Sequence, residues 1–61
     1  MFINCIKSDG GSVTINSDYI EYYERTNGTV AKTKIFCQNK TFYVKESKET
    51  IDKLLIKNQY D

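Results

Sequence analysis

Two β-patterned runs flank the dipeptide Asn27-Gly28, and this stretch constrains the fold more than any other part of the sequence. Asn-Gly is the pair of residues that best tolerates the positive φ angles of a two-residue type I′ turn. A turn of this kind pairs Arg25 with Val30 and fixes every pair beyond them, because strand residues advance in step on both sides of the turn. The run from residue 19 to residue 37 therefore predicts a β-hairpin with a defined register.

A third run of strand-forming residues follows a second turn signal, Asn39-Lys40. A two-residue loop at that position pairs Cys37 with Phe42 and Ile35 with Val44. The registers of the two hairpins agree, so residues 20–45 predict three consecutive antiparallel strands.

Alternation of side chains along these strands gives the predicted sheet two different faces. The face expected to cover a core carries mostly apolar residues: Ile20, Tyr22, Thr33, Ile35, Cys37, Phe42 and Val44. The opposite face is aromatic and basic, and seven of its residues form the candidate interaction surface: Tyr19, Tyr23, Lys32, Lys34, Phe36, Tyr43 and Lys45. Arg25 adds positive charge to this face, and Glu24 is a charged misfit on the core face.

A further hairpin is expected at the start of the chain, where Asp9-Gly10-Gly11 separates two β-patterned runs. A symmetric register across either Asp9-Gly10 or Gly10-Gly11 places Ile6, Val13 and Ile15 on one face and Ile3 and Cys5 on the other. Asn16-Ser17-Asp18 then predicts a short turn or a single helical turn, capped by Asn16 or Ser17.

The hydrophobic period changes from two to 3.6 after Glu46, which predicts an amphipathic helix. Ile51, Leu54 and Leu55 lie on its apolar side, and Ser47 is the expected N-cap. Three helical turns are too few to be stable alone, so the helix is expected to lie across the inner face of the sheet.

The predicted fold is therefore α+β: a five-stranded antiparallel β-meander, as a curved sheet or a partly open barrel, with one C-terminal helix on its inner face. A single domain of 61 residues is expected. The predicted strands cover residues 2–7, 12–16, 19–26, 29–37 and 41–45, and the predicted helix covers residues 48–58.

The composition argues against catalysis and metal binding. The chain has no histidine, which removes the usual general base at neutral pH and the commonest metal ligand. Cys5 and Cys37 lack the spacing of metal ligands and are expected to be buried, reduced thiols. No phosphate-binding glycine loop is present, since Asp9-Gly10-Gly11 reads as a hairpin turn. We therefore expect a non-enzymatic protein with no cofactor, no metal and no small-molecule substrate.

The opening residues show no charged region followed by a long apolar stretch, so no signal peptide is predicted and a cytoplasmic location is expected. No apolar run approaches the length of a membrane span, and no membrane insertion is expected. The net charge of +1 argues against a globally basic nucleic-acid-binding protein but allows a local basic patch.

Three uses of the aromatic and basic face stay open at this point. It could be an ordinary solvated sheet surface, since half-exposed tyrosines and Lys-Tyr pairs are common in sheets. It could bind a protein partner or a second copy of the chain, which a small domain with a limited core would favour. The third use is binding of single-stranded nucleic acid, with aromatic rings stacking on bases and lysines following phosphates.

Two segments resemble the FlbD family of small bacterial flagellar and swarming-motility proteins, also called SwrD. The first segment is residues 15–24, Ile-Asn-Ser-Asp-Tyr-Ile-Glu-Tyr-Tyr-Glu, and the second is residues 44–51, Val-Lys-Glu-Ser-Lys-Glu-Thr-Ile, at the strand-to-helix junction. The resemblance implies a non-enzymatic cytoplasmic accessory protein that supports the flagellar motor. Given the small core, we expect such a protein to act by self-association or by binding a protein partner. A weaker likeness, through residues 18–22, is to the first half of LytTR DNA-binding domains.

Overall fold

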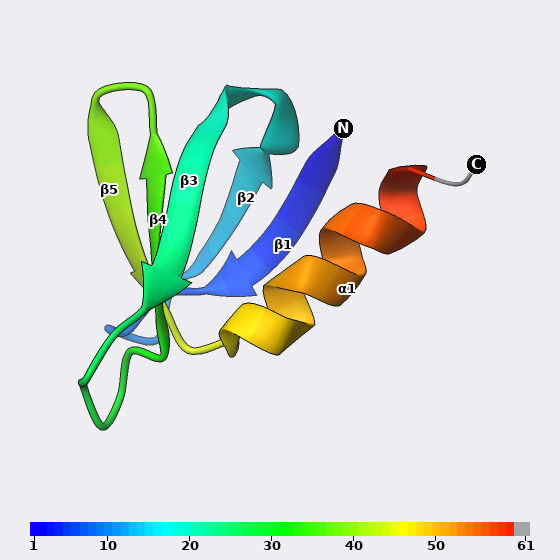
Figure 1. The fold of residues 1–61 in the computed structure, drawn as a ribbon. Helices are drawn as coiled ribbons and strands as arrows, with labels where there is room; N and C mark the ends of the chain where they lie inside the picture. Colours follow the sequence, from blue (N-terminus) through cyan, green and yellow to red (C-terminus); the bar gives the residue numbers. More distant parts are fainter. Residues whose placement is uncertain (60–61) are drawn as a thin grey trace.

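The computed structural model of the chain describes the backbone of residues 1–59 and the side chains of residues 1–56. It confirms the predicted class, with five antiparallel strands and one C-terminal helix (Figure 1). In chain order the elements are β1 (Phe2–Ile6), β2 (Ser12–Asn16), the 3₁₀ turn η1 (Ser17–Tyr19), β3 (Ile20–Arg25), β4 (Thr33–Cys37), β5 (Lys40–Val44) and α1 (Lys48–Gln59).

The strands form two sheets, β1-β2 and β3-β4-β5, where one continuous meander was expected. The sheets are joined where β1 ends and β5 ends, through an isolated bridge between Lys7 and Val44. Beside this bridge, the Lys45 N–H donates to the Ile6 carbonyl at 2.7 Å, and the Ile6 N–H donates to the Glu46 carboxylate at 3.0 Å. The segment between β5 and α1 thus ties the first hairpin to the second sheet.

The first hairpin pairs in a register that neither symmetric turn predicted. Ile3 lies opposite Ile15, and Cys5 lies opposite Val13. The Asp9 carboxylate accepts the Gly11 N–H at 2.9 Å, and Gly10 has a φ of 97°, so residues 7–11 form a longer loop than a two-residue turn. These four apolar side chains therefore share the inner face, which corrects the expected separation of Ile3 and Cys5 from Ile15.

Ile6 takes the opposite, outer face of this hairpin and is 39% exposed. The loop shifts the register by an odd number of residues, which exchanges the faces of one strand relative to the other. The prediction that placed Ile6 with Val13 and Ile15 was therefore wrong.

The hairpin between β3 and β4 also differs from the prediction, because Asn27-Gly28 does not form a type I′ turn. Gly28 does not adopt the required left-handed φ. Instead the Thr26 hydroxyl donates to the Ala31 carbonyl, and the Thr26 N–H donates to the Lys32 carbonyl at 3.1 Å. Thr26 thus closes a wider loop, and β4 begins at Thr33 instead of residue 29.

The wider loop changes which tyrosine of β3 faces the core. Arg25 lies opposite Thr33, three positions beyond the predicted partner Val30, and Tyr23 lies opposite Ile35. Tyr23 therefore faces inward and Tyr22 faces outward, the reverse of the expected arrangement. A bulge between Ile20 and Tyr22 returns Ile20 to the inner side.

The hairpin between β4 and β5 turns at Gln38-Asn39, since Cys37 lies opposite Lys40 and Ile35 lies opposite Phe42. The predicted register is shifted here by two residues, and an even shift leaves every side chain on its predicted face.

The core lies between the inner faces of the two sheets and is closed by α1. Its buried apolar residues are Ile3, Cys5, Ile15, Ile35, Cys37, Val44 and Ile51. Leu54 and Leu55 of α1 pack against this cluster. The Ser47 hydroxyl accepts the Thr50 N–H at 3.1 Å, which confirms Ser47 as the N-cap of the helix.

Candidate interaction surface

The outward face of the β3-β4-β5 sheet is built by two rows of cross-strand neighbours. One row joins Tyr22, Phe36 and Thr41. The other row joins Glu24, Lys34 and Tyr43. We call these six residues the outer face. Its aromatic residues come from three different strands, so the surface exists only when the whole sheet has formed.

Aromatic rings dominate the outer face. The rings of Tyr22 and Phe36 are stacked, with centroids 4.1 Å apart and planes inclined by 25°. Tyr22 on β3 is 52% exposed and Tyr43 on β5 is 48% exposed, so large side chains on the two strands that flank β4 are about half accessible to solvent. A stacked pair of this kind contributes about 0.5–1.5 kcal/mol beyond its buried area and holds both rings in place.

The charges of the outer face are paired with each other. Lys34 Nζ lies 3.5 Å from Glu24 Oε1 and 5.0 Å from the centroid of the Phe36 ring. The only formal charges among the six residues therefore cancel. The six residues of the outer face are therefore aromatic and close to neutral, whereas the sequence predicted a locally basic face; the other two predicted lysines, Lys32 and Lys45, lie just beyond the strand ends.

The seven predicted surface residues are placed in three groups. Lys34, Phe36 and Tyr43 lie on the outer face as expected. Lys32 and Lys45 are exposed just beyond the ends of β4 and β5. Tyr19 belongs to η1 and not to a strand, and Tyr23 faces inward, so both predicted positions are wrong. Sequence alternation also missed Tyr22 and Glu24, because the register of β3 depends on the Thr26 loop.

Tyr23 belongs to a polar network that docks α1 onto β3. Its hydroxyl donates to Asp52, whose carboxylate also lies 3.2 Å from Lys48 Nζ. The Lys48 Nζ lies 5.4 Å from the centroid of the Tyr23 ring. Arg25, from the next inward position of β3, pairs with Glu49. These contacts orient the helix and use the two β3 residues that the sequence had assigned to the opposite face.

The network shifts the pKa of both partners in the Tyr23–Asp52 hydrogen bond. The bond from Tyr23, together with Lys48 and Arg25, holds the pKa of Asp52 below its ordinary value of 3.8 despite the opposing effect of burial. Burial, followed by the hydrogen bond to Asp52 and its negative charge, raises the pKa of Tyr23 to about 12. The carboxylate and the neutral phenol therefore stabilise each other at neutral pH.

Replacing Asp52 by asparagine should make the free energy of unfolding depend less steeply on pH at acid pH. Because the pKa of Asp52 is lower in the folded state, its stabilising contribution is present above pH 3.8 and is lost as the pH falls below that value. Urea unfolding of the wild type and Asp52→Asn, measured across this pH range, checks the expectation. If the free energies of unfolding of the two proteins changed equally with pH, the Tyr23–Asp52 contact would be shown not to form.

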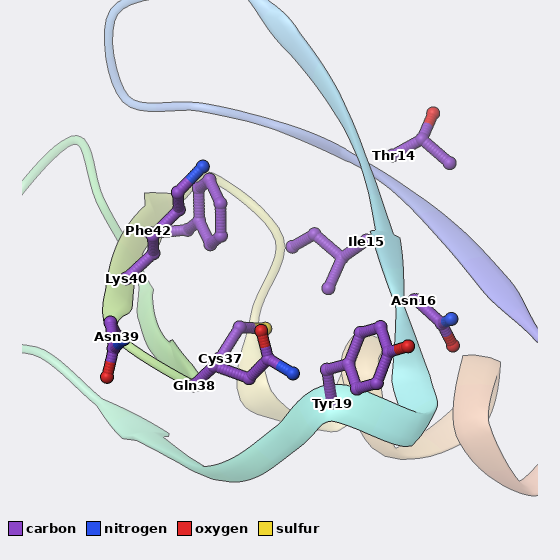
Figure 2. Close-up of a pocket in the computed structure, with 9 residues that line it drawn as sticks. All are labelled: Thr14, Ile15, Asn16, Tyr19, Cys37, Gln38, Asn39, Lys40 and Phe42. Carbon is purple, nitrogen blue, oxygen red and sulfur yellow. The ribbon is translucent and has the colours of Figure 1, made fainter.

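A groove opens between the two sheets at the end where β4 turns into β5. Its volume is about 280 Å³, and Figure 2 shows Ile15, Cys37 and Phe42 pointing into it. Tyr19 and Gln38 lie at its rim, and Gln38 has a positive φ of 53°, an uncommon conformation for this residue. No pattern in the sequence predicts this groove, because the groove depends on how far the two sheets separate.

The two thiols are free, and both belong to the buried core. Burial, together with the charges of Glu46 and Cys37, raises the pKa of Cys5 to about 11. Burial and the charge of Glu21 also raise the pKa of Cys37. Both thiols are therefore held in the protonated, weakly nucleophilic form.

Among the described residues, no three His, Cys, Asp or Glu side chains gather in a way that could hold a metal ion. No helix within residues 1–59 has the length and apolar character of a membrane span. The geometry thus offers an aromatic sheet face, and a groove into which Ile15, Cys37 and Phe42 point, as candidate binding surfaces. Comparison with known protein families, with curated proteins and with solved structures finds no match to this chain.

Proposed function

We propose that this chain is a small non-enzymatic accessory protein of the cytoplasm that acts by binding a second copy of itself through the outer face. The observation that carries the proposal is the half-exposed aromatic cluster of Tyr22, Phe36 and Tyr43, whose neighbouring charges are already paired. Aromatic residues are enriched in protein interfaces, and the fully buried centre of an interface is depleted of charge.

The charges of the outer face favour a symmetric partner. Lys34 and Glu24 lie side by side on this face, so a twofold axis could place each lysine near the glutamate of the second copy. The net charge of +1 gives little repulsion between two chains. Self-association would also bury aromatic surface for a domain whose own core is small.

The resemblance to the FlbD family supplies the setting for this proposal. A self-associating module of this size would act as an accessory of bacterial flagellar motility, by holding or organising other proteins. This pathway rests on the resemblance of residues 15–24 and 44–51 alone.

The double variant Tyr22→Ser, Tyr43→Ser tests the interface. We expect the wild type to form a dimer whose fraction rises with concentration in sedimentation equilibrium, and the double variant to weaken the dimer at least about tenfold. Tyr19→Ser is the matched control, because Tyr19 is 53% exposed but lies outside the outer face. A wild type that stays monomeric at every concentration would contradict the proposal.

The same face can be tested for the nucleic-acid function. Arg25 and Tyr23 are turned towards α1, and Lys34 is paired with Glu24, so the six residues of the outer face hold no unpaired positive charge beside the aromatic rings. We therefore expect no salt-dependent binding of random single-stranded oligonucleotides. Binding that Lys32→Glu combined with Lys34→Glu abolishes would favour the nucleic-acid function over self-association.

A further inference from the structure

The hydrogen-bond pattern of the first hairpin shows which backbone groups of β2 are unpaired. The Lys7 N–H donates to the Gly11 carbonyl at 2.7 Å, and the Ser17 N–H donates to the Met1 carbonyl at 2.8 Å. Hydrogen-bonded pairs alternate along an antiparallel ladder. In this register, Val13 and Ile15 therefore bond to β1, while the N–H and C=O groups of the residues between them point away.

The same alternation is visible on the other edge of the hairpin. The backbone N–H and C=O of Ile6 point away from β2. The N–H donates to the Glu46 carboxylate, and the C=O accepts the Lys45 N–H. On the β2 edge, Ser12 and Thr14 have no backbone partner among residues 1–59. β2 is thus an open edge strand, a template to which another strand can pair.

This open edge forms one wall of the groove between the sheets. Figure 2 shows the Ile15 side chain pointing into the groove and the Thr14 and Asn16 side chains pointing away from it. Thr14 and Asn16 nevertheless line the groove, so they do so with their backbone. Apolar side chains and unpaired backbone groups therefore face the same space.

The size and charge of the groove indicate what it could hold. A volume of about 280 Å³ falls just below the range, on the order of 300–1,000 Å³, of small-molecule sites, and it suits an inserted side chain. Lys40 is the only charged residue among the nine that line the groove. No carboxylate of residues 1–56 forms an ion pair with it, so the groove is complementary to a negative charge.

We propose that the β2 edge and this groove bind an extended acidic peptide segment of another protein. The segment adds a strand beside β2 and bonds to the backbone of Ser12 and Thr14. One apolar side chain of the segment enters the groove between Ile15 and Phe42, and a carboxylate side chain lies near Lys40. Strand addition of this kind draws affinity from backbone hydrogen bonds and specificity from the side-chain pocket.

A library of displayed heptapeptides, followed by amide hydrogen exchange, tests the proposal on the intact chain. We expect selected peptides to carry alternate apolar residues and at least one Asp or Glu. A bound peptide should slow exchange at the Ser12 and Thr14 amides at least about tenfold, while the Val13 and Ile15 amides, already bonded to β1, change little. Failure to select any peptide, or binding without this alternation, would overturn the proposal.

Three substitutions separate edge pairing from other modes of binding. Thr14→Pro removes an outward N–H without removing a bond to β1, and Thr14→Val is its matched control, because both lose the hydroxyl that donates to Asn4 Oδ1 at 2.7 Å. Only the proline variant should lose peptide binding. Lys40→Glu leaves the backbone groups of the β2 edge unchanged and should lower the affinity for acidic peptides at least about tenfold.

The remaining outcomes distinguish this site from the outer face. Protection of the Ser12 and Thr14 amides that rises with protein concentration and without peptide would place a second copy on this edge, and would overturn the proposal. Peptide binding that Tyr22→Ser, Tyr43→Ser abolishes would also overturn it, because those residues belong to the outer face. Unchanged peptide binding by that double variant is the expected result, whatever the variant does to self-association.

Discussion

Replacing Ile51 by alanine should lower the free energy of unfolding by about 2–5 kcal/mol. Ile51 is fully buried and is the residue of α1 that belongs to the core cluster shared by both sheets. Truncation removes its burial and leaves a cavity that the surrounding strands can close only in part. For a domain of 61 residues, a loss of this size is a large share of the total stability.

Ile56→Ala is the matched control for this variant, because Ile56 lies on the same helix and is 53% exposed. The control should change the unfolding free energy by less than about 0.5 kcal/mol beyond the small difference in helix propensity. Urea unfolding followed by circular dichroism measures both values. Equal, small losses in the two variants would show that α1 does not close the core.

Replacing Thr33 by valine should cost about 1–3 kcal/mol, although the two side chains have nearly the same shape. Thr33 is fully buried, and its hydroxyl donates to the Glu46 carbonyl at 2.7 Å. Valine cannot donate, so the Glu46 carbonyl loses this partner in the segment that joins β5 to α1. Chemical denaturation of the wild type and variant gives the difference.

Thr41→Val is a suitable control, because Thr41 occupies an exposed position on the opposite face of the same sheet. Valine is favourable in strands, so this change should leave stability within about 0.5 kcal/mol. A Thr33→Val protein as stable as the wild type would mean that the Thr33 hydroxyl does not hold the β5–α1 connection.

The parts of the fold that the sequence predicted correctly are those fixed by local signals. The apolar residues of β4 and β5 alternate so regularly that an even error in register left Ile35, Cys37 and Val44 on the core face. The Asn16 carboxamide accepts the Asp18 N–H at 3.0 Å, as expected for a capped turn. Ser47 caps α1 for the same local reason.

The errors arise where a side chain in a loop competes with the backbone turn. Thr26 widens the β3–β4 loop, and Asp9 lengthens the first hairpin loop. Each change moves the register by an odd number of residues, which reverses the faces of β3 and of one strand in the first hairpin. Tyr22 and Tyr23 are equally acceptable on either face by residue type, so the sequence pattern could not detect the reversal.

The candidate sites depend on these reversals and on long-range packing. The outer face became close to neutral because Arg25 turned towards Glu49 and Glu24 turned towards Lys34. The groove depends on the separation of two sheets that the sequence predicted as one. Neither property can be read from the alternation within a single strand.

The reversal of β3 is the claim on which the outer face, the helix-docking network and the proposed self-association all depend. Residues opposite each other at a position without ladder hydrogen bonds have Cα atoms about 4.5 Å apart, and their Hα protons face each other. Because the Thr26 N–H bonds to the Lys32 carbonyl, Tyr23 and Ile35 form such a pair. Nuclear Overhauser spectroscopy should therefore show a strong Hα–Hα cross-peak between Tyr23 and Ile35, whereas a cross-peak between Tyr23 and Lys32 in its place would contradict the fold and both surfaces of the β3-β4-β5 sheet.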